Sequence, residues 1–130
     1  MAKTVRVMLV ALMAVGLLSV AGAARASDDR EAISRGDCSR ISDWKVRIRT
    51  DGPSRLDLEF EAGEVPGQLW RVQMTYNSRV VFSGNVRSGA DGEFDVDREV
   101  ANAPGLDTLR GNATNLQTGE TCRGSVSASF

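Results

Sequence analysis

The side chains of this chain that could do chemistry are carboxylates spaced two residues apart. Five acids occupy alternate positions between residues 91 and 99, namely Asp91, Glu93, Asp95, Asp97 and Glu99. Calcium favours several oxygen ligands that lie close together. Alternate residues of one strand lie roughly 7 Å apart and point the same way, so a single strand builds a row of carboxylates and no cage. We therefore predict that this run is a solvated face, and we keep a calcium site as the alternative.

Other catalytic constellations are missing from the sequence. The chain has no histidine, which excludes Ser-His-Asp and Cys-His sites and the usual zinc ligand sets. It also contains no phosphate-binding loop and no dinucleotide-binding fingerprint. A pair of carboxylates could hydrolyse a glycoside, but nothing in the sequence places two of them in a cleft. We predict that the protein is not an enzyme and uses no cofactor or metal.

The first 26 residues have the pattern of a cleaved secretory signal peptide. Lys3 and Arg6 precede an apolar or small-residue run over residues 7–24, and Ala24-Arg25-Ala26 provides a cleavage site. Ala21-Gly22-Ala23 is a second possible cleavage site. An uncleaved membrane anchor is the rival reading, because about 18 apolar residues are the lower limit for a membrane span. We expect a secreted protein that has no contact with a membrane after cleavage.

Cleavage after Ala26 would leave a single acidic domain. Removing Lys3, Arg6 and Arg25 changes the formal net charge from −1 to −4. A negative net charge argues against a nucleic-acid partner, whose phosphates need a positive surface. We expect a monomer whose partner is a protein or a cell surface.

Cys38 and Cys122 are the two cysteines of the chain. In an exported protein two cysteines are expected to pair. The bridge would close a loop of about 85 residues and stabilise the domain by up to roughly 4–5 kcal/mol. Two free thiols or an intermolecular bridge are the alternatives.

The elements that must position these residues are short strands. Between residues 67 and 76, apolar Trp70, Val72, Met74 and Tyr76 alternate with Leu69, Arg71, Gln73 and Thr75. This two-residue period indicates a strand with one buried face. It predicts Trp70 as a core residue, for whose ring small residues at positions 84, 111 and 113 make room.

Six further runs with the same period predict strands at 44–50, 56–62, 80–87, 93–100, 109–113 and 122–130. We therefore predict an all-β, seven-stranded antiparallel sandwich over residues 38–130, immunoglobulin-like or fibronectin-III-like. A closed barrel is the main alternative. Residues 27–37 show no apolar periodicity and are predicted to form a flexible tail.

Charge patterns and turn signals predict two registers. Pairing 44–50 with 56–62 so that Thr50 lies opposite Leu56 also sets three opposite charges against each other: Arg49 and Asp57, Arg47 and Glu59, Lys45 and Glu61. Such pairs stabilise a sheet by about 0.2–1 kcal/mol each, which explains the basic stripe without a ligand. In the next hairpin, placing Phe82 on the Trp70 face favours a three-residue loop, Asn77-Ser78-Arg79, over a two-residue Asn77-Ser78 turn.

Several segments together resemble a group of small exported actinobacterial proteins of unknown function. The matching segments are Cys38 followed by Trp44, then residues 67–70 (GQLW), 92–94 (GEF), 104–109 (PGLDTL) and 115–124 (NLQTGETCRG). The chain departs from this group at Asp95 and Asp97, where the group would have apolar/basic alternation. The resemblance implies a secreted β-sandwich and transfers no catalytic residue.

The sequence favours a secreted, non-catalytic binding module for a protein or cell-surface partner. The alternatives are a small-molecule carrier and an enzyme inhibitor that presents a loop at 63–67 or 101–104. An apolar concave pocket would favour the carrier, a flat apolar patch the binding module, and a rigid protruding loop the inhibitor. Leu69, Val81 and Leu106 are the candidates for such a patch. The integrin-type tripeptide Arg35-Gly36-Asp37 is attributed to chance.

Overall fold

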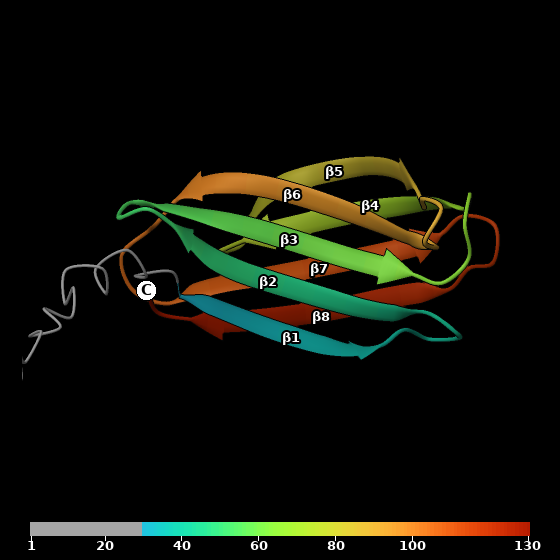
Figure 1. Ribbon diagram of the computed structural model, residues 1–130, viewed down its shortest axis with the longest axis horizontal. Coiled ribbons are helices and arrows are strands. Elements are labelled where there is room, and N and C mark those ends of the chain that lie inside the picture. The colour runs from blue at the N-terminus through green and yellow to red at the C-terminus, as the bar shows by residue number, and fades with distance from the viewer. Residues whose placement is uncertain (1–29) are drawn as a thin grey trace, which may run out of the picture.

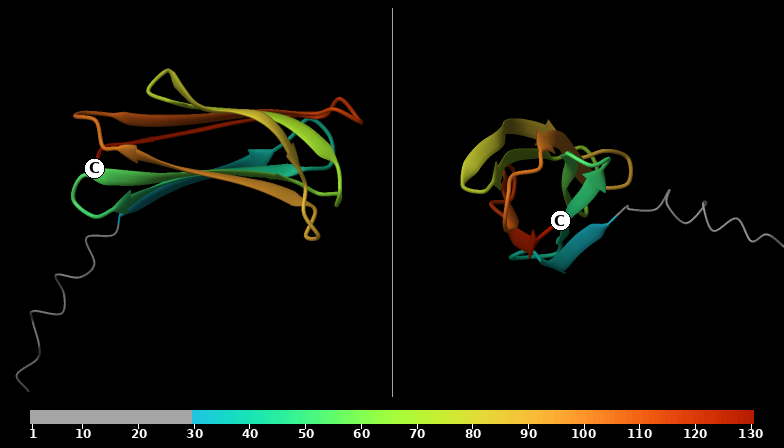
Figure 2. Two further views of the ribbon diagram at one scale, coloured as in Figure 1. Left: turned by 90° about the horizontal axis from the view of Figure 1, so that it is seen from above. Right: turned by 90° about the vertical axis from the view of Figure 1, so that its left-hand side faces the viewer.

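The computed structural model describes residues 30–130, which form eight antiparallel strands. The strands are β1 (Glu31–Asp37), β2 (Asp43–Asp51), β3 (Arg55–Gly63), β4 (Leu69–Tyr76), β5 (Arg79–Arg87), β6 (Glu93–Ala101), β7 (Asp107–Asn115) and β8 (Thr121–Ala128). They form two separate sheets, sheet A in the order β1-β2-β3-β6 and sheet B in the order β5-β4-β7-β8 (Figure 1). The two sheets lie face to face as the layers of a sandwich (Figure 2), whereas a barrel would need one continuous sheet.

The predicted signal peptide, residues 1–26, lies outside the described residues. Among residues 30–130 there is no helix that is long and apolar enough to cross a membrane.

β1 is the strand that the sequence did not predict, and it raises the strand count from seven to eight. It pairs with β2 along its whole length, from Glu31 opposite Arg49 to Asp37 opposite Asp43. The expected flexible tail is therefore wrong for Glu31–Asp37. The positions of β1 that face inward are Ala32, Ser34 and Gly36, which are too small to produce an apolar alternation. The strand is held instead by backbone hydrogen bonds, which every buried strand must satisfy.

The pairing of β2 with β3 has the predicted register. Thr50 lies opposite Leu56, and the three predicted pairs of opposite charges face each other on the outer surface of sheet A. Inward-facing Val46 and Ile48 pair with Phe60 and Leu58 in the same ladder. The alternation of charge and the alternation of apolar side chains therefore select the same register, as a one-residue slip would expose the core side.

In the hairpin of β4 and β5, Phe82 pairs as predicted, but the turn between the strands is shorter than predicted. Phe82 lies opposite Met74, on the Trp70 face as expected. The three-residue loop is wrong, because Asn77 and Ser78 form a two-residue turn with φ angles of 47° and 68°. Positive φ at both positions is the geometry of a hairpin turn that matches strand twist. The register shift between Met74 and Thr75 leaves Val81 as the extra residue of a β-bulge.

The core lies between the sheets and contains Trp70 as predicted. It is built from Val46, Ile48, Leu56, Leu58, Phe60, Ala62, Trp70, Val72, Met74, Tyr76, Phe94, Val96, Leu109, Ala113 and Cys122. The Trp70 ring lies 5.5 Å from the Phe94 ring, centroid to centroid. The small residues expected beside Trp70 accommodate other rings: Gly111 lies against Phe60 and Gly84 against Phe82.

Cys38 and Cys122 form the predicted disulfide, with their Cα atoms 4.4 Å apart. The bond joins the segment after β1 to the inward face of β8 and so links the two sheets. We call this end of the sandwich the disulfide end; its loops are residues 38–42, 64–68, 88–92 and 116–120.

Candidate functional site

The predicted acidic run lies on the outer face of sheet A, where it meets a second row of acids. Four of its residues belong to β6, and Asp91 lies in the preceding loop, where its Oδ1 accepts a hydrogen bond from the Glu93 N–H. The ladder between β3 and β6 sets three pairs of acids opposite each other: Asp57 and Glu99, Glu59 and Asp97, Glu61 and Asp95. Like charges directly opposite each other destabilise a sheet. The sequence alone did not reveal this, because β3 and β6 are not consecutive strands.

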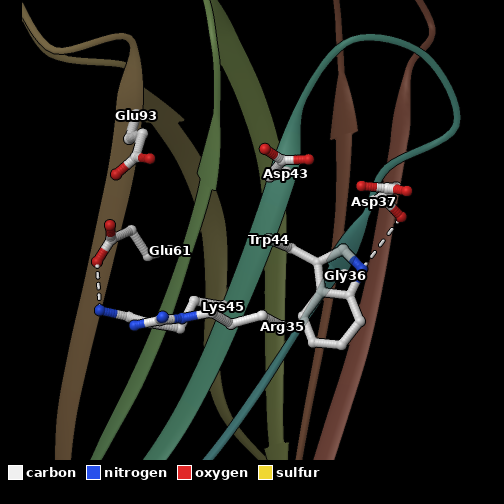
Figure 3. Close-up of a pocket in the computed structure, with 8 residues that line it drawn as sticks. All are labelled: Arg35, Gly36, Asp37, Asp43, Trp44, Lys45, Glu61 and Glu93. Carbon is white, nitrogen blue, oxygen red and sulfur yellow. Dashed lines mark hydrogen bonds and ion pairs between the residues drawn. The ribbon is translucent and has the colours of Figure 1, made fainter.

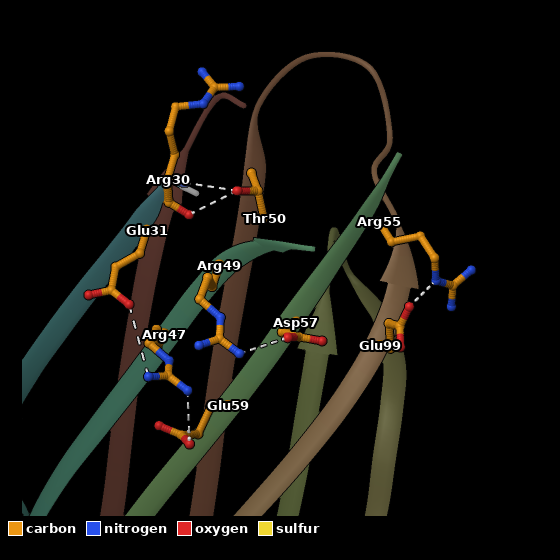
Figure 4. Close-up of polar contacts among 9 residues, drawn as sticks. All are labelled: Arg30, Glu31, Arg47, Arg49, Thr50, Arg55, Asp57, Glu59 and Glu99. Atoms are coloured by element: carbon orange, nitrogen blue, oxygen red, sulfur yellow. Dashed lines mark hydrogen bonds and ion pairs between the residues drawn. The ribbon is translucent and has the colours of Figure 1, made fainter. Parts of the chain in front are cut away.

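Cations of β2 and β3 neutralise much of this acidic surface. The Lys45 Nζ lies 2.9 Å from the Glu59 Oε1 and 3.1 Å from the Glu61 Oε2. Arg47 lies 3.3 Å from Glu59 on the other side. Arg49 and Arg55 make the corresponding ion pairs with Asp57 and Glu99 (Figure 4). Glu59 is almost fully buried among these charges, with 7% of its surface exposed.

Two groups of three carboxylates on this face bring oxygens close enough to share a cation. One group is Asp51, Asp57 and Glu99, and the other is Glu59, Glu61 and Asp95. Basic side chains already form ion pairs with both groups. Lys45 pairs with Glu59 and Glu61 of the second group. In the first group, Arg49 pairs with Asp57 and Arg55 pairs with Glu99. The arrangement is that of a salt-bridge network, and it supports no metal proposal.

Crowding of carboxylates shifts several pKa values on this face. A hydrogen bond with Glu61, followed by desolvation, raises the pKa of Glu93 to about 7. Desolvation, followed by the charge of Glu59, raises the pKa of Asp95 to about 7 and that of Asp97 in the same direction. The hydrogen bond from Glu93 lowers the pKa of Glu61. The surface therefore carries less negative charge near neutral pH than its composition suggests.

β1 and β8 lie side by side at one edge of the sandwich (Figure 1), and the Trp44 ring of β2 contacts both strands there. The ring fills the gap between the sheets by packing on two glycines, Gly36 of β1 and Gly124 of β8. Its Nε1 donates a hydrogen bond to the Asp37 carbonyl oxygen at 3.2 Å. The Trp44 side chain is half-buried and lies between a hollow on each side.

The first hollow opens on sheet A and has a volume of about 470 Å³ (Figure 3). Its lining is polar and of mixed charge: Arg35, Gly36, Asp37, Asp43, Trp44, Lys45, Glu61 and Glu93. The Arg35-Gly36-Asp37 tripeptide is part of this lining. It lies within β1, where the Trp44 ring covers Gly36, so it is not presented on an exposed loop.

The second hollow is a groove of about 560 Å³ on the other side of Trp44. Its lining is basic and polar and contains no acid: Ser34, Trp44, Arg110, Asn112, Arg123, Gly124 and Ser125. The sequence did not predict this groove, because three strands from two sheets contribute to it beside Trp44 of β2.

Exposed apolar side chains are concentrated in the loops of the disulfide end. Three of the six large exposed hydrophobic residues of the described chain lie there: Ile41 (66% exposed), Val65 (38%) and Leu116 (41%). The residues predicted for an apolar patch do not cluster. Leu69 and Val81 are half-buried, and Leu106 lies in the loop between β6 and β7 at the opposite end.

Polar contacts, several of them buried, tie these loops to one another and to the strands. The Glu120 carboxylate accepts hydrogen bonds from the Ser42 hydroxyl at 2.6 Å and from the backbone N–H groups of Ser42 and Arg40. Burial opposes ionisation of Glu120, but these hydrogen bonds outweigh it and lower its pKa. The Ser88 hydroxyl donates to the Val65 carbonyl oxygen at 2.7 Å, and the Asn115 side chain caps the turn of residues 116–119.

Comparisons of the chain with family models, with curated protein sequences and with solved structures found no match.

Proposed function

We propose that the protein is an exported, non-catalytic binding module that contacts a protein partner through the loops of the disulfide end. The observation that carries this proposal is the placement of Ile41, Val65 and Leu116, which are exposed on loops that hydrogen bonds and a disulfide hold in place. Single exposed apolar residues are ordinary on a protein surface. Three on the anchored loops of one end are the arrangement expected of a recognition surface.

Pre-organisation is the physical advantage of this surface. A loop that is already ordered loses little conformational entropy on binding, so more of the contact energy appears as affinity. Immunoglobulin-like and fibronectin-like sandwiches, the topology that the sequence favours, present binding loops at one end in the same manner. This support is an analogy at the level of the fold.

Export is part of the proposal and rests on three observations. Residues 1–26 have the pattern of a signal peptide. The Cys38–Cys122 disulfide suits an oxidising compartment. The segments that resemble small exported actinobacterial proteins point the same way. The non-catalytic part of the proposal rests on the lack of histidine in the chain and on the engagement of the outer-face carboxylates in ion pairs.

The alternative functions have weaker support. A small-molecule carrier needs a concave and mainly apolar pocket, whereas the two hollows beside Trp44 are lined mostly by polar and charged residues. An enzyme inhibitor could use the loop that carries Val65, one of the two loops the sequence suggested. The second loop suggested, residues 101–104, has one side anchored by the hydrogen bond from the Ala103 N–H to the Tyr76 hydroxyl.

A matched pair of triple variants tests the proposal. In one, Ile41→Ser, Val65→Ser and Leu116→Ser remove the apolar side chains of the disulfide end. In the other, Ile33→Ser, Val80→Ser and Leu106→Ser remove the other three large exposed hydrophobic residues. Each protein is immobilised and exposed to culture and envelope fractions of the producing organism, and the captured proteins are identified by mass spectrometry and then titrated as purified partners.

We expect a partner that binds the wild type and the control variant with similar affinity and binds the disulfide-end variant at least about tenfold more weakly. Capture of the same partner by both variants would place the binding surface elsewhere. Failure of the wild type to bind any purified candidate more tightly than a heat-denatured sample would contradict the proposal. Cleavage or turnover of a captured partner would contradict the non-catalytic part alone.

A further inference from the structure

The outer face of sheet B carries positive charge without any acid. The outward positions of its four strands hold Arg71, Arg87, Arg110 and Arg123, and their other polar residues are Ser, Thr, Asn and Gln. This contrasts with the outer face of sheet A, where rows of carboxylates and cations neutralise each other. The two faces of the sandwich are therefore electrostatically different, although the net charge of the whole chain is only −1.

Arg110 of β7 and Arg123 of β8 are neighbouring arginines on the outer face of sheet B. Both side chains are exposed, and neither makes an ion pair or a side-chain hydrogen bond with another residue of the described chain. The register places them on neighbouring strands as diagonal partners, since Arg110 faces Ser125 and Arg123 faces Asn112. Diagonal neighbours lie about 7–8 Å apart. Guanidinium groups on two such neighbouring positions attract anions because no acid among residues 30–130 pairs with either of them.

The groove beside Trp44 gives these two arginines a shaped surface. Both line the groove of about 560 Å³, together with Asn112, Ser125 and Ser34 of β1. Trp44 also lines this groove, and its ring packs on Gly124, which is another lining residue. The groove therefore combines paired cations, neutral hydrogen-bonding groups and one aromatic surface.

We propose that this groove binds an acidic polysaccharide, a chain of hydroxylated sugar rings that carry carboxylate groups. A guanidinium group matches a carboxylate with two parallel hydrogen bonds. The amide of Asn112 and the hydroxyls of Ser34 and Ser125 donate to and accept from sugar hydroxyls. The indole offers its edge and exposed surface to the apolar C–H groups of a sugar ring, and aromatic residues contribute large contact areas of this kind.

Other anionic partners use fewer features of the groove. A phosphate polymer would satisfy the arginines but leave the indole and most of the neutral donors unused. The acidic face of a second copy is already engaged in ion pairs with Lys45, Arg47 and Arg49, and a flat sheet does not enter a groove. The groove lies apart from Ile41, Val65 and Leu116, so this proposal stands independently of the protein-binding surface.

Titration of the purified protein with hexagalacturonic acid tests the proposal, with a neutral hexasaccharide of galactose as the matched ligand. Calorimetry measures affinity, and tryptophan fluorescence reports the site. The chain has two tryptophans, and Trp70 is fully buried, so a change in emission on binding originates at Trp44. We expect the acidic hexamer to bind and to shift the emission, the neutral hexamer to bind at least tenfold more weakly, and affinity to fall with added salt.

Two double variants with the same change in charge separate groove binding from general attraction. Arg110→Gln with Arg123→Gln removes both groove cations, and Arg71→Gln with Arg87→Gln removes two arginines of the same face that do not line the groove. We expect the first pair to weaken binding of the acidic hexamer about tenfold or more and the second pair to weaken it less than threefold. All four residues are exposed, so both variants should keep the melting temperature of the wild type.

Several results would overturn the proposal. They are no binding of the acidic hexamer, equal binding of the neutral hexamer, equal losses in the two double variants, or tighter binding of a polyphosphate of similar length. Salt-sensitive self-association that only the Arg110→Gln/Arg123→Gln variant abolishes would assign the groove to a second copy instead. If that variant does not fold, amide shift mapping of the wild type decides, because shifts away from Asn112 and Ser125 would also overturn the proposal.

Discussion

Gly124 lies so close to the indole ring of Trp44 that a Cβ atom at position 124 would come within 2.3 Å of the ring carbon Cε3. Gly36 has the same relationship with the ring, with 2.5 Å to Cζ2. Neither glycine has a positive φ, so space for the ring, and not backbone conformation, requires glycine here. The Trp44 ring thus fills the edge of the sandwich between β1 and β8. Each of these strands has a glycine where it contacts the ring.

We expect Gly124→Ala to destabilise the protein by about 1–3 kcal/mol, because the added methyl group forces the Trp44 ring out of its position. Urea unfolding measures the change. Gly89→Ala is the control, since a Cβ atom there meets no atom closer than 3.6 Å. Equal stability of Gly124→Ala and the wild type would show that the ring does not pack on β8.

Trp70→Ala should destabilise the protein by about 3–5 kcal/mol, because the ring is fully buried and contacts Phe94. Trp70→Phe should cost clearly less than Trp70→Ala, since it keeps an aromatic ring and leaves a smaller cavity, and it removes an Nε1 that has no hydrogen-bond partner among the described residues. Thermal unfolding compares the two variants. A melting temperature that Trp70→Ala leaves unchanged would contradict the core position of this ring.

Reduction of the Cys38–Cys122 disulfide should destabilise the domain by about 4–5 kcal/mol in the chain-entropy model, because the bond spans 84 residues of sequence. Thiol titration of the denatured protein should find no free thiol before reduction and two afterwards. The Cys38→Ala/Cys122→Ala variant should unfold at the lower temperature with or without reductant. Two titratable thiols in the untreated protein would rule out the bond.

Stability should fall as pH rises from about 4 to 7 through the contribution of Asp95. Desolvation and the charge of Glu59 raise its folded-state pKa to about 7, so between its unfolded and folded pKa values the folded state binds more protons than the unfolded state. Asp95→Asn should therefore raise the melting temperature more at pH 8 than at pH 5. Because Asp95 is exposed, we expect a gain below about 1 kcal/mol, or up to about 5 °C.

Glu64→Gln, which removes an exposed carboxylate in a loop, is the control for this pH dependence and should show a smaller difference between pH 5 and pH 8. An Asp95→Asn variant whose gain is the same at both pH values would contradict the raised pKa.

Part of the fold could be predicted from sequence because local patterns carry it. The pairing of β2 with β3 was predicted residue by residue, since charge alternation and apolar alternation select one register. β1 was missed because Ala32, Ser34 and Gly36 bury almost no apolar surface and Ile33 points outward. The β-bulge at Val81 was missed because an extra residue in a strand changes its parity without changing its composition.

Candidate sites were harder to predict than strands. The acidic run was recognised, but its electrostatic environment depends on the acids of β3 that lie opposite it, Asp57, Glu59 and Glu61. These acids are more than 30 residues away in sequence, so the run alone does not reveal them. The groove that holds Arg110 and Arg123 could not be predicted, because it forms only where β1, β7 and β8 meet beside Trp44.

By itself the sequence determined which side chains of each predicted strand face inward, which two cysteines pair, and how β2 and β3 align. These features follow from the two-residue period of a strand and from the number of cysteines. Only the tertiary structure decided which strands are neighbours, and with them the acid pairs of sheet A and the groove beside Trp44. The physical reason is that alternation specifies the face of a strand and carries no information about the strand that lies next to it.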